Sequence, residues 1–317
     1  MLMIPPVYSI ILLVLFTQFF DPFRRDVLEG NVNQLQLGLI TLILWLRLNK
    51  NKKQNNFLSG LILGLLFMLK PNLALIFIFL FINELILTSA KYLLYSAAGI
   101  PTGVVLGFSL PLLFFGKTCG WIQWLIHFPK IALVDIYMKT SFIYIFFGIK
   151  RLIYYYLLMF ILILLPFFII FMASLVSKIY EIRKINIFTA DKTIFIFDIL
   201  MITLGASVYL LSSPLVHFHY FILIVPSILL ILAPGNKLKS LLSKDNLIRI
   251  LFAIILISLF NIRTYHEGYE AIAIYRTYWP FAYVAVILIY GYSILQLMHL
   301  YKNGQIRFNK QRNEGLV

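Results

Sequence analysis

Long apolar runs separated by short polar stretches make up most of this chain. The runs are continuous and about 16–24 residues long, which suits helices that cross a bilayer. A membrane β-barrel would instead need short strands of alternating polarity. The pattern predicts about ten spanning helices, at residues 4–20, 34–48, 57–69, 71–88, 92–115, 152–175, 193–211, 220–235, 247–262 and 280–298. We therefore expect an all-α polytopic membrane helix bundle, one domain over residues 1–298, followed by a basic cytoplasmic tail at 299–317.

The third and fourth runs nearly touch at Lys70 and Pro71. A proline removes one helical hydrogen bond and disfavours helix in the residue before it. The pattern therefore predicts two helices, and a single kinked helix over 57–88 is the alternative.

The composition agrees with a membrane protein. Hydrophobic residues make up 62% of the chain and charged residues only 12%, and a soluble domain of this length could not bury so much apolar surface. The net charge of +15 is not gathered into a basic block with interleaved aromatic residues, so nucleic acid is not an expected partner. The single cysteine, Cys119, excludes an internal disulfide and offers no zinc pattern. The sequence predicts no metal and no cofactor.

Lysine and arginine residues are shared unevenly between alternate connections. Short loops rich in these residues stay on the cytoplasmic side of a membrane. The richer set consists of five groups: Arg47, Lys50, Lys52 and Lys53; Lys91; Lys178, Arg183, Lys184 and Lys192; Lys237, Lys239, Lys244 and Arg249; and Lys302, Arg307, Lys310 and Arg312. Both termini are then cytoplasmic in a plasma membrane, and polar clusters at 30–33, 70–72 and 213–220 share the outer face.

The segment 213–220 places two histidines and a tyrosine between two spans. Ionisable groups at such a depth are costly and are usually kept for function. His217 and His219 face opposite ways in a strand and in a helix, so they do not form an obvious chelating pair. One interpretation is that an imidazole binds or protonates a phosphate, with Tyr220 as a hydrogen-bond donor. The alternative is that both histidines lie in the interface beside an aromatic belt.

The other two clusters also have two interpretations each. Lys70 either holds an anionic headgroup or extends its ammonium group to the membrane surface from a span end. Asn31 and Asn33 either donate hydrogen bonds to a ligand or cap a helix. Asp26 and Glu29, just before them, are either a general base or solvated loop acids.

The order of these clusters resembles the polyprenol-phosphate-mannose-dependent mannosyltransferases of glycosyltransferase family 87. The family has a Gly-Gln-x-Asn turn before a span, where this chain reads Gly-Asn-Val-Asn at 30–33. A Gly-rich span ending in Lys-Pro follows, as residues 60–71 do here. A Ser-Pro-x-x-Trp-x-His-Tyr segment comes later, and residues 213–220 match it with His217 in place of the tryptophan. Thr140 and Ser141 are similar to a Gln-Ser element of the family.

The resemblance implies a GT-C-like fold and a hexosyltransferase, specifically a mannosyltransferase, at the outer membrane face. Its partners would be a polyprenyl-phosphate-sugar donor, a lipid or glycan acceptor and membrane lipids. It implies a phosphate site made of Lys70, Tyr220, Asn33, Asn31 and His217, with His219 as a catalytic residue. Asp26 or Glu29 is the candidate from this chain for the base, in place of the residue that the family uses.

The chain matches the family from the third span onward. The family's first external loop, which supplies the aspartate regarded as the base, has no counterpart here. We therefore expect slow transfer, or none, unless a separately encoded N-terminal segment supplies that loop. Two alternatives from other classes are a polyprenyl-lipid transporter or flippase, and a catalytically silent membrane protein.

Overall fold

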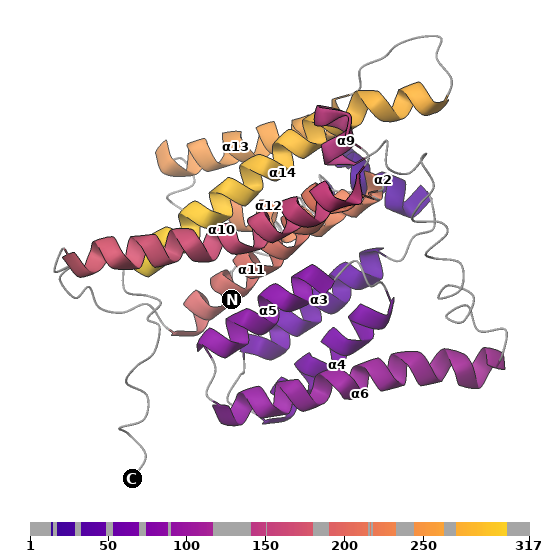
Figure 1. Cartoon of the computed structure of the whole chain (residues 1–317), viewed down its shortest axis with the longest axis vertical. Helices are drawn as coiled ribbons and strands as arrows, with labels where there is room; N and C mark the ends of the chain where they lie inside the picture. The colour runs from indigo at the N-terminus through magenta and orange to yellow at the C-terminus, as the bar shows by residue number, and fades with distance from the viewer. Residues whose placement is uncertain are drawn as a thin grey trace. The chain divides into compact units, whose positions relative to one another are not determined.

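The computed structural model is all-helical, with no strand among the residues that it describes (Figure 1). Those residues are 14, 18–28, 33–48, 53–69, 74–87, 90–116, 141–149, 151–179, 190–214, 216, 218–232, 244–262 and 271–302. The first predicted span, 4–20, therefore lies almost entirely outside the described residues.

Each predicted run from 34–48 onward coincides with described helix, and two short helices, α2 and α9, lie between runs. In chain order the helices are α2 (Asp21–Leu28), α3 (Asn33–Leu48), α4 (Lys53–Leu69), α5 (Ala74–Leu87), α6 (Ala90–Phe115), α9 (Phe142–Phe147), α10 (Leu152–Ile179), α11 (Ala190–Ser212), the 3₁₀ helix η3 (Phe218–Ile224), α12 (Val225–Leu232), α13 (Lys244–Asn261) and α14 (Ala271–Lys302). Since α4 and α5 are separate helices, the two-helix interpretation around Pro71 is confirmed.

Four described helices are long and apolar enough to cross a membrane. Their apolar stretches are Leu93–Phe114, Leu152–Ile169, Phe195–Ser212 and Pro280–Leu300. Other apolar helices are shorter: α5 has 14 residues, which at 1.5 Å per residue is about 21 Å against a hydrocarbon core of about 30 Å. The structure thus supports an α-helical membrane protein, and the ten-span arrangement stays a prediction.

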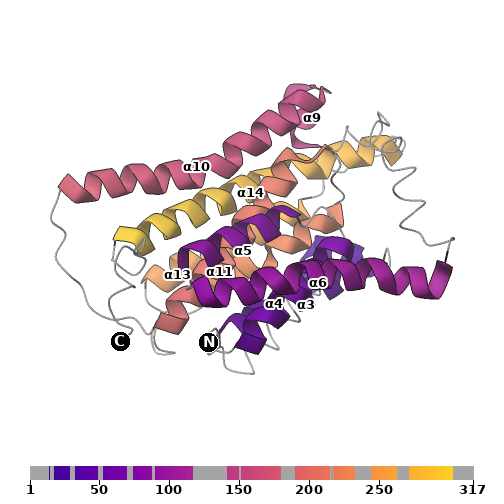
Figure 2. The ribbon, with the colours of Figure 1, turned by 60° about the horizontal axis from the view of Figure 1, so that its bottom comes forward.

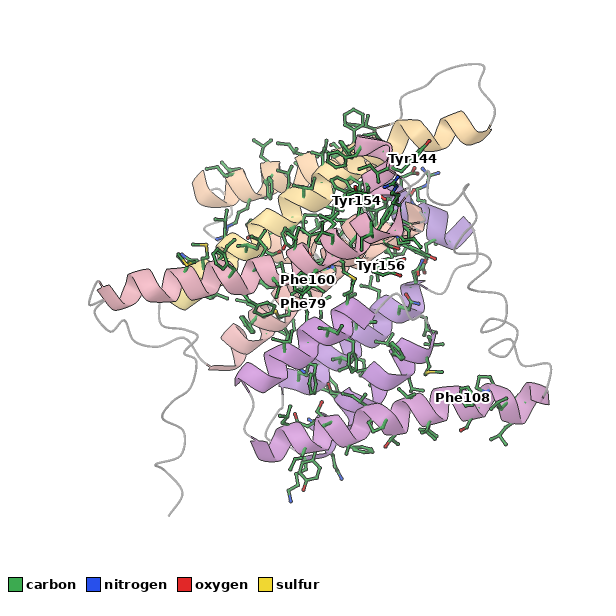
Figure 3. All side chains as sticks on the ribbon, in the orientation of Figure 1. Phe79, Phe108, Tyr144, Tyr154, Tyr156 and Phe160 are labelled. Atoms are coloured by element: carbon green, nitrogen blue, oxygen red, sulfur yellow. The ribbon has the colours of Figure 1, made fainter. Side chains whose placement is uncertain are left out.

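The long apolar helices differ in how much of their surface other parts of the protein cover. The stretch Phe195–Ser212 of α11 is 89% buried, whereas Leu93–Phe114 of α6 and Leu152–Ile169 of α10 are each 11% buried. Figure 3 labels Tyr154, Tyr156 and Phe160 along α10, and all three are exposed. Because apolar surface of this length is unfavourable in water, α6 and α10 are suited to lipid contact.

The chain divides into two compact units. The first unit comprises residues 1–38, 124–161 and 206–290, and the second comprises 39–123, 162–205 and 291–317.

In the second unit, α4 and α6 lie side by side at backbone contact (Figures 1 and 2). A Cβ atom built on Gly60 would overlap the carbonyl oxygen of Ser96, and one built on Gly103 would overlap that of Leu61. Gly64 and Gly99 meet the partner helix in the same way. Small residues spaced four apart allow helices in a membrane to pack at this separation. The Gly-rich span that carried part of the family resemblance therefore has a packing role.

The second unit also contains a buried ion pair between α3 and α11. Arg47 donates from Nε to Oδ2 and from Nη2 to Oδ1 of Asp198, both at 2.8 Å. The side chains are 0% and 1% exposed, respectively. The sequence analysis placed Arg47 at the end of a span and did not pair it. The bidentate hydrogen bonding satisfies both carboxylate oxygens of Asp198, and this offsets much of the free-energy cost of burying the two charges.

Aromatic side chains form the centre of the first unit. Phe221 of η3 contacts Phe260 and Tyr283, with ring centroids 5.6 and 5.5 Å apart. Phe260 of α13 also meets Phe20, at 5.3 Å. Edge-on contacts of this kind add to the free energy of burial. The 3₁₀ helix that carries His219 and Tyr220 is therefore anchored by the core of its unit.

Candidate functional site

The structure describes some of the predicted site residues and not others. Glu29, Asn31, Lys70 and His217 lie outside the described residues. His219 lies within η3, but its side chain is not described. The predicted convergence of Lys70 with His219 consequently stays a prediction. The remaining predicted residues, namely Asp26, Asn33 and Tyr220, are described, and all belong to the first unit.

Asp26 and Asn33 form a buried hydrogen-bonded pair. Asn33, the first residue of α3, donates from Nδ2 to Oδ1 of Asp26 on α2 at 2.5 Å. Both residues are 0% exposed. The interpretation of Asp26 as a solvated loop acid is therefore wrong. A short amide-to-carboxylate hydrogen bond holds the carboxylate in one orientation and offsets part of its desolvation.

The helix that carries Asp26 packs against η3, which carries His219 and Tyr220. Tyr220 is buried, and its ring lies 5.9 Å from that of Tyr209 on α11. The predicted loop 213–220 is thus shorter than expected, because η3 begins at Phe218. Tertiary packing places η3, with the buried Tyr220, next to α2 in the first unit.

A backbone tether fixes the start of α2. The backbone N–H of Asp21 donates to Oδ1 of Asn261 at 3.0 Å, and the Asn261 amide donates to the carbonyl oxygen of Phe19. Asn261 is the last residue of α13, so one carboxamide joins the end of that helix to the beginning of α2. The tether limits the motion of the helix that presents Asp26.

One buried polar residue of this region was missed by the sequence analysis. Gln36 on α3 is 0% exposed and lies one helical turn beyond Asn33. Residues three apart share a helix face, so Gln36 and Asn33 are neighbours on α3. The spacing of two amides at 33 and 36 inside an apolar run was the available signal.

Ser141, part of the family resemblance, has a structural role. Its side chain caps α9 by accepting a hydrogen bond from the backbone N–H of Tyr144 at 3.3 Å. Its hydroxyl also pairs with the Tyr155 hydroxyl at 2.6 Å, and Tyr155 donates to the carbonyl oxygen of Ile149 at 3.2 Å. These bonds fix the turn between α9 and α10.

Ser141→Ala is expected to lower the free energy of unfolding by about 1–2 kcal/mol, since it removes a helix cap and the buried hydrogen bond to the Tyr155 hydroxyl. Denaturant titration in mixed micelles measures this. Thr102→Ala is a matched control, because that hydroxyl bonds only its own helix at Ala98 and is exposed, and it should change stability by less than about 0.5 kcal/mol. Equal effects of the two substitutions would contradict the role of Ser141.

The Asp26 carboxylate, held by the Asn33 amide, is a group that can accept a proton. Among the residues that the structure describes, no group of three or more His, Cys, Asp or Glu side chains is placed to hold a metal ion.

Comparison with family models, with curated proteins and with solved structures gave no match. The family resemblance is therefore carried by the sequence motifs alone.

Proposed function

We propose that this chain is a membrane glycosyltransferase that moves a hexose, specifically mannose, from a polyprenyl-phosphate donor to a lipid or glycan acceptor. The observation that carries the proposal is the Asp26–Asn33 pair on α2 and α3, since α2 packs against η3 with His219 and Tyr220. A carboxylate and a histidine-bearing helix from distant parts of the sequence thus belong to one compact unit. The ordered motif resemblance supports the same assignment.

In the proposed reaction the acceptor hydroxyl oxygen attacks the anomeric carbon of the donor sugar. The bond between that carbon and the phosphate oxygen breaks, and polyprenyl phosphate leaves with the electron pair. Asp26 accepts the hydroxyl proton, and the hydrogen bond from Asn33 orients its carboxylate. The cationic groups Lys70 and His219 stabilise the phosphate as its charge grows.

Burial sets a condition on this chemistry. Because the Asp26 carboxylate is fully buried, an acceptor reaches it only when the packing around α2 opens. Closure of the helix over bound substrates would then exclude water, which otherwise competes with the acceptor.

The test is transfer of radiolabelled mannose from a polyprenyl-phosphate donor in membranes, with and without a two-span segment carrying an external aspartate. Asp26→Asn and His219→Ala are each expected to lower the rate about 10²-fold or more. Asp21→Asn is the matched control, because Asp21 lies on the same helix and has no assigned role in the reaction. Its rate should stay within a few-fold of wild type. Unchanged rates in the first two variants would contradict the proposal.

A lipid transporter is the second candidate, because Asp198 is an acid buried within an apolar stretch. Buried intramembrane charges are typical of substrate and ion paths. Its pairing with Arg47 by two hydrogen bonds also suits a fixed structural role. Movement of labelled polyprenyl phosphate across proteoliposomes, without any sugar transfer, would favour the transporter.

A further inference from the structure

Gln36 is a buried polar side chain that the proposed reaction does not use. It is 0% exposed, and neither Oε1 nor Nε2 has a hydrogen-bond partner among the residues that the structure describes. Nearly all buried polar groups in native proteins are paired, because a buried amide without partners is destabilising. A helix that has apolar residues on most of its length thus keeps a carboxamide at one buried position. The donors and acceptors of this carboxamide are therefore left open to a ligand by the described residues.

The neighbours of Gln36 indicate the chemistry of that partner. Gln36 shares a face of α3 with Asn33, and Asn33 is bonded to Asp26 on α2. The face that carries both amides is therefore turned toward the carboxylate. The three side chains together offer N–H donors, carbonyl acceptors and a carboxylate acceptor within the first unit.

We infer that Gln36, Asn33 and Asp26 form a binding site for the hydroxyl groups of a hexose. A hydroxyl both donates and accepts, so two neighbouring hydroxyls satisfy both polar atoms of one carboxamide and also a carboxylate oxygen. A phosphate is disfavoured beside the Asp26 carboxylate by charge repulsion. Among the described residues, Asp26 does not belong to a group of three or more His, Cys, Asp or Glu side chains placed to hold a metal ion.

The identification of the hydroxyl ligand as a sugar rests on the proposed function. Either the donor or the acceptor supplies the hexose, and the recognition chemistry is the same for both. Since Gln36 is fully buried, the sugar reaches it only when the packing around this part of α3 opens. Gln36 is then a specificity residue, because a sugar that lacks the matching hydroxyl leaves the buried amide unpaired.

The test is binding of methyl mannoside to the full chain in phospholipid nanodiscs, measured by saturation-transfer NMR titration. Gln36→Met keeps the length of the side chain and removes its polar atoms, and it should weaken binding about tenfold or more. Gln34→Met is the matched control, since Gln34 lies on the same helix but is about 200° away around it, and its binding should equal that of wild type. Displacement of the probe by a short-chain polyprenyl-phosphate mannose assigns the site to the donor sugar, and failure to displace it assigns the site to the acceptor.

A ligand-side measurement covers the case in which Gln36→Met does not fold. Methyl mannosides that each lack one hydroxyl are titrated against wild type, and at least one should bind about tenfold more weakly than the parent. Three results would each overturn the inference. All of the deoxy methyl mannosides could bind wild type as tightly as the parent, Gln36→Met and Gln34→Met could bind methyl mannoside equally well, or wild type could fail to bind it. Binding that depends on Gln36 without any transfer, even when the two-span segment is supplied, refutes the proposed function alone. Transfer that is unaffected by Gln36→Met refutes the inference alone.

Discussion

Asp198→Ala should lower the free energy of unfolding by about 3–5 kcal/mol, the usual result of removing one partner of a buried ion pair. The guanidinium of Arg47 would remain 0% exposed with both of its hydrogen bonds to the carboxylate lost. An uncompensated charge at that depth is more costly than the contacts that the alanine removes. Unfolding by sodium dodecyl sulfate in mixed micelles, followed by circular dichroism, measures the change.

The double variant Arg47→Leu with Asp198→Leu separates charge from packing. It leaves no unpaired charge, so its stability should lie within about 1 kcal/mol of wild type or above it. Arg249→Leu serves as the control, since Arg249 on α13 is exposed and its loss should change stability by less than about 0.5 kcal/mol. A double variant as unstable as Asp198→Ala would mean that shape, and not charge pairing, governs the contact.

Gly103→Ala should separate α4 from α6 and destabilise the second unit by about 3 kcal/mol. The added methyl group would overlap the backbone carbonyl oxygen of Leu61, and backbone of a packed helix cannot turn aside as a flexible side chain can. The helices must therefore move apart along a contact that also involves Gly60, Gly64 and Gly99. The same unfolding titration reports the loss, and disulfide crosslinking between cysteines on α4 and α6 reports the separation.

Gly38→Ala provides a control with the opposite expected sign. Gly38 lies inside α3, and among the described residues no atom lies within 4 Å of the position that a Cβ would occupy. Alanine favours helix over glycine by about 1 kcal/mol, so this variant should be neutral or more stable. If Gly103→Ala proved as harmless as Gly38→Ala, close backbone packing between α4 and α6 would be ruled out.

The positions of most of the long helices were predictable from the sequence to within a few residues, whereas α14 begins at Ala271, before the predicted start at 280, and the short helices α2 and α9 were not predicted. The predicted runs 34–48, 92–115 and 193–211 correspond to α3, α6 and α11. Proline at 71 correctly indicated a boundary between two helices. These features are local. An apolar run in a membrane must satisfy its backbone hydrogen bonds within one helix, and a proline interrupts that helical hydrogen bonding whatever the helix packs against.

The partners of the polar residues were decided only by tertiary structure. Asp26 and Glu29 were equivalent in the sequence, yet Asp26 is buried against Asn33 because α2 packs on η3. Ser141 matched a family element and instead caps α9. Each of these outcomes depends on which helix lies beside the residue in space.

Composition indicated a membrane-type protein, since a soluble domain of this length could not bury so many apolar residues, and the length of the apolar runs indicated helices. They could not determine that Arg47 pairs with Asp198, because the two are 151 residues apart and their contact depends on how α3 meets α11. Nor could they show that Gln36 is buried. Apolar periodicity is a property of one segment, whereas the pairing of a buried charge or amide is a property of two segments that folding brings together.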